Sequence, residues 1–105
     1  MRILITTEQI GSIQRIVKNL EGRTDIKELN IMYNPIVEDS IMIRYNSYFT
    51  TEDGAIKMEI KYICLDKRGL ESNCVTKYGE SFYFVLRDYQ PINLDSPSIE
   101  IIWTS

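Results

Sequence analysis

Two pairs of adjacent carboxylates are the side chains of this chain best suited to chemistry. Glu38-Asp39 and Glu52-Asp53 could each perform acid–base catalysis or bind a hard cation. Both pairs lie where turns are predicted, and Asp is frequent in turns because its side chain bonds to nearby backbone groups. We interpret both pairs as turn residues and keep a small carboxylate- or metal-dependent enzyme as a less favoured alternative.

Cys64 and Cys74 are the other candidates, and the chain has no histidine. Without histidine, Ser–His–Asp and Cys–His catalysis and His-ligated zinc sites are excluded, and two cysteines are too few for a Cys₄ site. The strand pairing predicted for this region places Cys64 opposite Ser72 and Cys74 opposite Tyr62. The two Cβ atoms would then lie on a diagonal about 7 Å apart, whereas a disulfide needs about 4 Å. The sequence therefore predicts two buried free thiols, no catalytic residue, no metal site and no cofactor.

Phosphate and nucleic-acid sites are also not expected. The five glycines are isolated, so no Gly-rich phosphate loop is present. Tyr48 with Lys57 and Lys61 is the best candidate for base stacking, since aromatic side chains beside cations can stack bases on a sheet. Glu59 lies among them and the formal net charge is −3, whereas nucleic-acid binders usually carry a basic stripe. Nucleic acid is therefore a less favoured partner than protein.

The N-terminal third predicts a strand followed by an amphipathic helix. Residues 2–6 alternate and are rich in Ile, and Thr6 or Thr7 is a good N-cap with Glu8 in the first turn. Gly22 is the predicted end of the helix. The helical stripe consists of Ile10, Ile13, Ile16, Val17 and Leu20. Residues 24–36 are ambiguous, although alternation at residues 29, 31 and 33 favours a strand.

A β-hairpin is the clearest signal in the chain. Two alternating runs within residues 41–65 flank Asp53-Gly54, a preferred two-residue hairpin turn. This turn predicts that Phe49 faces Met58, Tyr45 faces Tyr62 and Ile43 faces Cys64. One face of the hairpin would then be apolar, with Ile41, Ile43, Tyr45, Phe49, Ile56, Met58, Ile60, Tyr62 and Cys64.

The last third predicts further strands. Asp66-Lys67-Arg68-Gly69 suits a type I turn, residues 70–77 a strand, Tyr78-Gly79 a tight turn and residues 81–87 an inner strand that is apolar on both faces. Residues 88–97 predict a loop, and Ile99, Ile101 and Trp103 a final strand. Together these elements predict one α+β domain over residues 1–105. In it, an N-terminal strand and helix precede a mostly antiparallel sheet of five or six strands, with the helix packed on one face.

A second apolar row on this sheet is the candidate interaction site. A helix of ~14 residues is about 21 Å long and ~10 Å wide, whereas six strands span about 29 Å, so the helix covers about a third of one face. We therefore predict that part of the sheet packs against a second subunit; the alternative is a sheet that bends and buries both rows by itself. The predicted patch consists of Met42, Ile63, Leu65, Val75, Phe82, Phe84 and Leu86.

Composition bounds the class of protein. The chain has 105 residues, of which 44% are hydrophobic and 26% charged, as in globular domains. No apolar run approaches the ~18 residues of a membrane helix, and the apolar start is too short for a signal peptide. We therefore expect a cytoplasmic protein that is not associated with membranes. The frequency of Ile, Tyr and Asn, with Ala55 as the only alanine, suggests an AT-rich genome.

The first seventeen residues carry a weak resemblance. Arg2-Ile3-Leu4-Ile5-Thr6 followed by Gln9, Ile13 and Ile16 resembles the start of many small proteins of tailed phages. The resemblance implies a phage or prophage accessory protein, in the host cytoplasm or the virion, and it brings no functional residues with it. The function favoured by the sequence is a non-catalytic interaction or structural protein that self-associates through its sheet. The alternative is a small inhibitor that binds a host or defence protein such as a nuclease.

Overall fold

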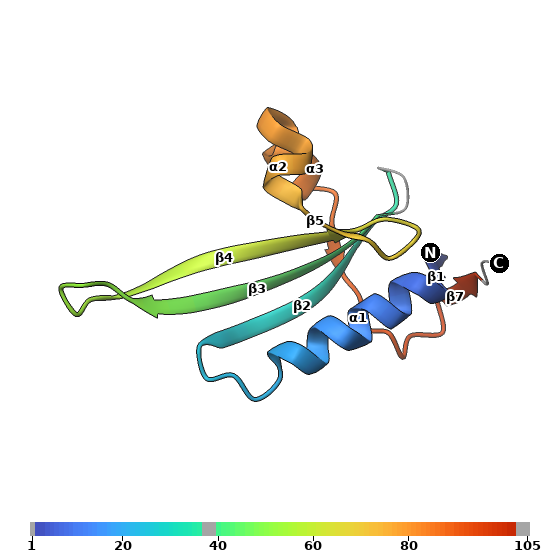
Figure 1. Cartoon of the computed structure of the whole chain (residues 1–105). Helices are drawn as coiled ribbons and strands as arrows, with labels where there is room; N and C mark the ends of the chain where they lie inside the picture. Colours follow the sequence, from blue (N-terminus) through green and yellow to red (C-terminus); the bar gives the residue numbers. More distant parts are fainter. Residues whose placement is uncertain (1, 37–39, 103–105) are drawn as a thin grey trace.

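The computed structural model describes residues 2–36 and 40–102 and has an α+β architecture, as expected (Figure 1). The elements in chain order are β1 (Ile3–Thr6), α1 (Thr7–Leu20), β2 (Ile26–Asn34), β3 (Ser40–Thr50), β4 (Ile56–Leu65), β5 (Glu71–Asn73), α2 (Cys74–Tyr78), the 3₁₀ turn η1 (Gly79–Ser81), α3 (Phe82–Leu86), β6 (Gln90–Pro91) and β7 (Ile99–Ile102). No helix in the described part of the chain is long and apolar enough to cross a membrane.

Helix α1 begins and ends where its sequence predicts. Thr6 is the N-cap: its side chain accepts a hydrogen bond from Gln9 N, and the Gln9 side chain accepts one from Thr6 N, which completes a capping box. Ile13 and Ile16 point into the core. The helix stops before Gly22, which adopts a φ of +79° that favours glycine.

The strands form two sheets. The larger sheet is antiparallel and has five strands in the order β5-β4-β3-β2-β6, and β1 pairs with β7 in a separate parallel ribbon. The strand suggested by the alternation at residues 29–33 is therefore present as β2. Ile99–Ile102 confirm the predicted last strand, whereas Trp103 lies outside the described residues.

The hairpin is present, but its predicted register is wrong by one residue. Ile43 pairs with Ile63, Tyr45 with Lys61 and Phe49 with Lys57. The turn is longer than predicted, because Thr51 N donates to Ala55 O at 2.8 Å and Gly54 N donates to Thr51 O at 3.0 Å, which leaves three residues in the loop. Gly54 has a φ of +85°, as in three-residue loops that end in a left-handed residue. The shift moves every β4 side chain to the other face of the sheet relative to β3.

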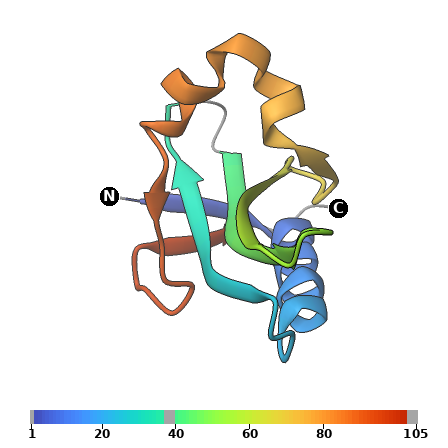
Figure 2. The same ribbon diagram turned by 90° about the vertical axis from the view of Figure 1, so that its left-hand side faces the viewer.

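Each face of the larger sheet carries a hydrophobic core. Figure 2 shows α1 on one side of the sheet and α2 and α3 on the other. Strand β3 contributes to both cores, since Ile41 and Ile43 face α1 while Met42 faces α2 and α3. The core on the α1 side consists of Ile3, Ile5, Ile13, Ile16, Tyr33, Ile41, Ile43 and Leu65. The smaller core on the other side consists of Met42, Cys64, Cys74, Phe82 and Tyr89. The second apolar row of the sequence is thus covered largely by the chain itself.

The strand predicted at residues 70–77 is present only over Glu71–Asn73, and the strand predicted at residues 81–87 is wrong. Strand β5 stops at Asn73, whose side chain accepts a hydrogen bond from Thr76 N at 3.1 Å and caps α2. Residues 79–86 continue as η1 and α3, so Tyr78-Gly79 is not a hairpin turn. The predicted inner strand is a short helix that buries Phe82 and exposes Tyr83 and Phe84. The loop predicted at residues 88–97 contains the short strand β6, which pairs with β2.

Candidate functional site

The seven residues of the predicted patch do not form one surface. Met42, Leu65 and Phe82 are buried, the first and third in the smaller core and Leu65 in the core under α1. Ile63 packs against the α1 core and Leu86 against the smaller one, on opposite faces of the sheet. Val75 on α2 and Phe84 on α3 are exposed, at 50% and 67%. The register shift and the helical residues 74–86 explain the dispersal.

Of the two carboxylate pairs, the structure describes only Glu52-Asp53. Asp53 lies in the β3–β4 loop, where it accepts hydrogen bonds from the Thr51 hydroxyl and from Ala55 N, and these bonds lower the pKa of Asp53. Glu52 lies beside it in the same exposed loop. Glu38 and Asp39 lie outside the described residues. Among residues 2–36 and 40–102, no three His, Cys, Asp or Glu side chains are grouped so that they could hold a metal ion.

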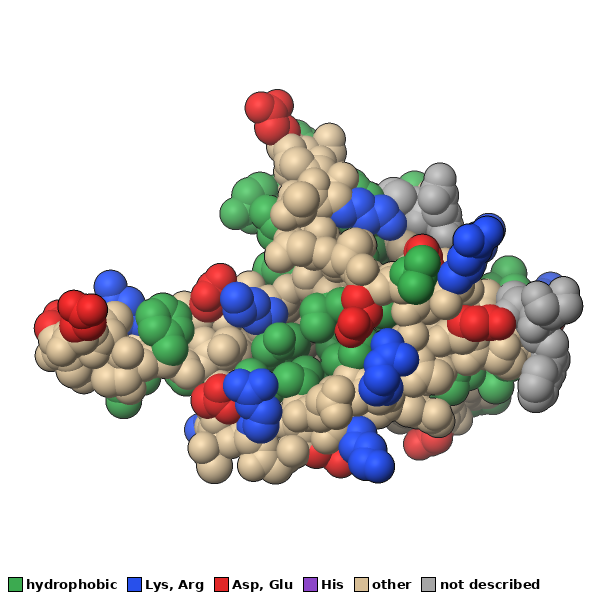
Figure 3. Space-filling view, in the orientation of Figure 1, with side chains coloured by type: hydrophobic (Ala, Val, Ile, Leu, Met, Phe, Trp, Pro, Cys, Tyr) green, Lys and Arg blue, Asp and Glu red, His purple; other side chains and the backbone are tan. Residues whose placement is uncertain are grey.

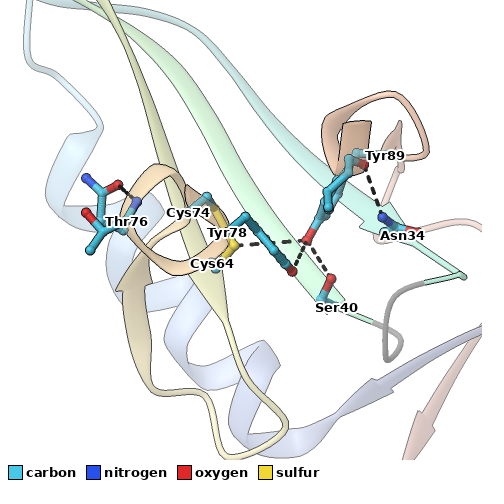
Figure 4. The surroundings of a disulfide bond; sticks show 9 residues. Asn34, Ser40, Cys64, Cys74, Thr76, Tyr78 and Tyr89 are labelled. Carbon is cyan, nitrogen blue, oxygen red and sulfur yellow. Dashed lines mark hydrogen bonds between the residues drawn. A yellow bond between two sulfur atoms is a disulfide. The ribbon is translucent and has the colours of Figure 1, made fainter. Parts of the chain in front are cut away.

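Cys64 and Cys74 form a disulfide, which overturns the prediction of two free thiols (Figure 4). Cys64 is indeed opposite Ser72, as the sequence indicated. The chain leaves the strand conformation after Asn73, however, and the first turn of α2 carries Cys74 back toward Cys64. The Cα atoms are 5.3 Å apart, within the range for disulfides. The bond joins β4 to α2 at the centre of the smaller core.

Three hydroxyl groups, two on buried residues and one on the half-buried Tyr78, lie beside the disulfide (Figure 4). The Tyr89 hydroxyl lies 2.5 Å from Ser40 Oγ, 3.4 Å from the Tyr78 hydroxyl and 4.0 Å from Cys64 Sγ. Burial raises the pKa of Tyr89 above its ordinary value, so its hydroxyl is protonated at neutral pH. The group therefore forms a neutral crosslink between β3, α2 and the segment before β6.

A cleft with a basic lining opens next to these hydroxyls. Its volume is about 740 Å³. The lining brings together the turn at residues 66–70, the start of α1 and the end of α2. Lys67, Arg68 and Lys77 supply positive charge, Leu70 and Tyr78 supply apolar surface, and the rest of the lining consists of Gln9, Ser40, Leu65 and Asp66. Sequence reasoning missed this cleft; the only local signal was the adjacent pair Lys67-Arg68 in a predicted turn.

The end of the β3–β4 hairpin projects beyond the rest of the molecule. We call residues 48–58 the β3–β4 arm. Strand β2 pairs with β3 only as far as Ser47, so the pairs Tyr48–Met58 and Thr50–Ile56 lie in a two-stranded ribbon that extends past β2 and α1 (Figure 1). Apolar and charged side chains alternate on its surface (Figure 3). Ile56, Met58 and Phe49 are exposed, at 75%, 47% and 45%.

The outer edge of β4 has no neighbouring strand along much of its length. Strand β5 covers β4 only from Ile63 to Leu65. Within the described part of the chain, no strand pairs with the outer edge over residues 56–62, which we call the free edge of β4. Its side chains sort by face. Ile56, Met58, Ile60 and Tyr62 point to the α2 side, and Lys57, Glu59 and Lys61 point to the α1 side.

Comparison with known proteins gives no relative: no family model, no curated protein and no solved structure matches this chain. Its function is therefore inferred from the geometry of its own residues.

Proposed function

We propose that this chain is a non-catalytic interaction protein that self-associates through its sheet, by pairing the free edge of β4 with the same edge of a second copy. The proposal rests on one observation: this edge of β4 is unpaired along the projecting β3–β4 arm and carries exposed apolar side chains there. Unpaired strand edges are templates for pairing with another chain, and natural proteins usually block them. β5 blocks only the last three residues of β4.

The backbone groups at the edge are oriented for pairing. Thr51 N bonds to Ala55 O, so the odd-numbered residues of β4 direct their backbone groups toward β3. Antiparallel ladders alternate, and therefore the even-numbered residues direct their N–H and C=O groups outward. Asp66, the next even-numbered residue after β4, likewise directs its N–H outward, where it bonds to Leu70 O on the β5 side. Ile56, Met58 and Ile60 are thus available to a second strand.

Charge selects one register for two antiparallel copies. If Met58 lies opposite Met58 of the second copy, Lys57 lies opposite Glu59, Glu59 opposite Lys57, and Ile56 opposite Ile60. Opposite charges across strands stabilise pairing, and like charges weaken it. Centring the pair on Glu59 would place Glu59 opposite Glu59 and Lys57 opposite Lys61, which repel. Centring it on Ile60 would run Ile56 of the second copy against Cys64, whose edge is already paired with Ser72 of β5.

Pairing about Met58 also joins the exposed apolar side chains. Residues opposite each other in an antiparallel pair lie on the same face, so Ile56 and Met58 of both copies would form one strip on the α2 side. The alternating charges would form a second strip on the α1 side. The free edge of β4 is therefore complementary to itself on both faces of the joined sheet.

The test is sedimentation equilibrium over a wide range of protein concentration. The wild-type chain is expected to form a reversible dimer. Met58→Pro removes an outward N–H and should give a monomer, because proline cannot donate to the ladder. Met58→Thr keeps that N–H and is the matched control, expected to remain a dimer. A wild-type monomer at millimolar concentration, or dimers of equal affinity for the Pro and Thr variants, would refute the proposal.

A charge-exchange experiment tests the register. Lys57→Glu or Glu59→Lys alone creates two like-charge pairs, and each should weaken the dimer about tenfold if each pair changes by roughly 0.7 kcal/mol. The two single variants should form a heterodimer when mixed, and the double variant should dimerise like the wild type. Failure of both to restore pairing would exclude the register centred on Met58.

A further inference from the structure

The cleft beside the start of α1 has one firmly held wall. The Thr6 hydroxyl donates to Lys67 O at 2.7 Å, and the Ser12 hydroxyl donates to Gly69 O at 2.6 Å. These bonds attach the turn at residues 66–69 to the first turns of α1. Gly69 lies so close to α1 that a Cβ there would be 2.5 Å from Glu8 O. Lys67 and Arg68 therefore project from a turn whose backbone position is fixed.

Gln9 supplies an unused hydrogen-bond donor to this cleft. Its side chain is 1% exposed and lines the cleft. The bond from Thr6 N to Gln9 Oε1, at 3.0 Å, fixes the orientation of the amide and leaves Nε2 as the free end. No described residue accepts a hydrogen bond from Nε2. Buried donors are almost always paired, and the described residues supply no acceptor for this one.

The lining charges favour an anion as that acceptor. Among the described residues, the lining of the cleft contains three cations, Lys67, Arg68 and Lys77, and one carboxylate, Asp66. Asp66 Oδ1 already accepts hydrogen bonds from Arg68 N and Leu70 N, both at 2.9 Å. The three cations form no ion pair with any residue in the described ranges. Arg and Lys bind carboxylate and phosphate groups through charge-assisted hydrogen bonds.

We infer that this cleft binds a small organic anion, whose carboxylate or phosphate group accepts from Gln9 Nε2 and contacts the lining cations. Its apolar part would pack on Leu70, which is 62% exposed, and on Tyr78. The volume of about 740 Å³ lies within the usual range for ligand sites, which is roughly 300–1,000 Å³. An inorganic ion alone would leave most of this space and the apolar wall unused. This site is separate from the free edge of β4 and does not depend on dimer formation.

Three probes that share one ring system distinguish the contribution of the anionic group from that of the apolar ring. 1-Naphthyl phosphate, 1-naphthoate and neutral 1-naphthol are titrated into ¹⁵N-labelled protein and followed by NMR. At least one anion is expected to saturate, to shift the Gln9 side-chain amide and the backbone amides of residues 67–70, and to bind at least tenfold tighter than 1-naphthol. Which anion binds better distinguishes phosphate from carboxylate as the natural group. Equal binding of 1-naphthol, or no saturable shift of these signals up to about 10 mM, would overturn the inference.

Variants assign the binding to these side chains. Lys67→Gln and Lys77→Gln should each weaken anion binding about tenfold, the factor of roughly 1.4 kcal/mol, while Lys18→Gln in the last turn of α1 should leave it unchanged. Gln9→Glu keeps a capping-box acceptor at this position and replaces the free donor with a negative charge, so it should abolish anion binding. Its far-UV circular dichroism must match the wild type. Unweakened binding by Gln9→Glu, or equal weakening by Lys18→Gln, would overturn the inference.

Discussion

Loss of the Cys64–Cys74 disulfide should lower the free energy of unfolding by about 2.7 kcal/mol. The bond closes a short loop, since the two cysteines are separated by 10 residues. The chain-entropy relation for a loop of that length gives about 9 cal/mol/K, or about 2.7 kcal/mol at 25 °C. This is a large share of the 5–15 kcal/mol that usually separates the folded and unfolded states. The loop spans the end of β4, all of β5 and the start of α2.

Urea unfolding followed by far-UV circular dichroism measures this difference. The protein is reduced in denaturant, refolded with reductant, and compared with the oxidised form. With a slope of about 1.3 kcal/mol/M, the midpoint should fall by about 2 M. The Cys64→Ala/Cys74→Ala variant is the control, and reductant should not change its midpoint. A shift in the wild type below about 0.5 M would refute the reasoning, because the crosslink would then contribute little to stability.

Three further perturbations test other parts of the fold. Gly69→Ala should lower the free energy of unfolding by about 2–4 kcal/mol, because it adds the cost of a left-handed backbone conformation, roughly 1–2 kcal/mol, to a clash with Glu8 O. Gly54 also has a positive φ but has open space around it, so Gly54→Ala should be destabilised only by the backbone cost. Equal thermal shifts for the two variants would contradict the packing of the turn on α1. Tyr89 has a raised pKa in the folded state, so its contribution to stability is complete below the unfolded value of about 10 and is lost as pH rises through the folded pKa. Tyr89→Phe should remove that alkaline loss in chemical denaturation at pH 9 to 12, and an unchanged pH profile would count against the buried hydroxyl group. Ile13→Ala, at a side chain that is 1% exposed, should lower the free energy of unfolding by about 2–5 kcal/mol. Ile56→Ala on the arm is compared in the monomeric Met58→Pro variant, where it should change the free energy of unfolding by less than about 0.5 kcal/mol.

Local signals were sufficient for the first half of the fold. The stripe of Ile13 and Ile16, the Thr6 cap and Gly22 define α1 because each acts within one helical turn. The hairpin was found for the same reason. Its register was not, because β4 is apolar on both faces at its end, where Ile63 and Leu65 alternate with Tyr62 and Cys64. The alternation of residues 56–61 favoured pairing the apolar rows of the two strands, which is not the register that forms. The hydrogen bonds of the loop decide it.

Tertiary contacts decide the second half. The run Phe82-Tyr83-Phe84 favours a strand by intrinsic propensity, but it folds as a five-residue helix whose one buried side chain, Phe82, packs edge-on against Tyr62 with ring centroids 4.9 Å apart. Helices this short gain their stability from packing and not from propensity. The disulfide was missed because the prediction extended the strand past Asn73.

The candidate sites depend on long-range arrangement in the same way. Lys67 and Arg68 are neighbours in sequence, but Gln9 and Lys77 join them only because the turn at residues 66–69 attaches to α1 and α2 folds back on β4. The free edge of β4 exists because β5 is only three residues long. Nothing in the alternation of residues 70–77 indicates so early an end.

The division of the interior by the larger sheet has a consequence for motion. α1 and β1 rest on one core, and α2 and α3 rest on a smaller one that contains the disulfide. Such units can open separately, each with its own free energy, and the one with fewer buried apolar side chains opens more readily. The basic cleft takes Gln9 from the first unit and Lys77 from the second. A molecule held there would bridge the two units, so its occupancy would oppose the opening of α2 and α3.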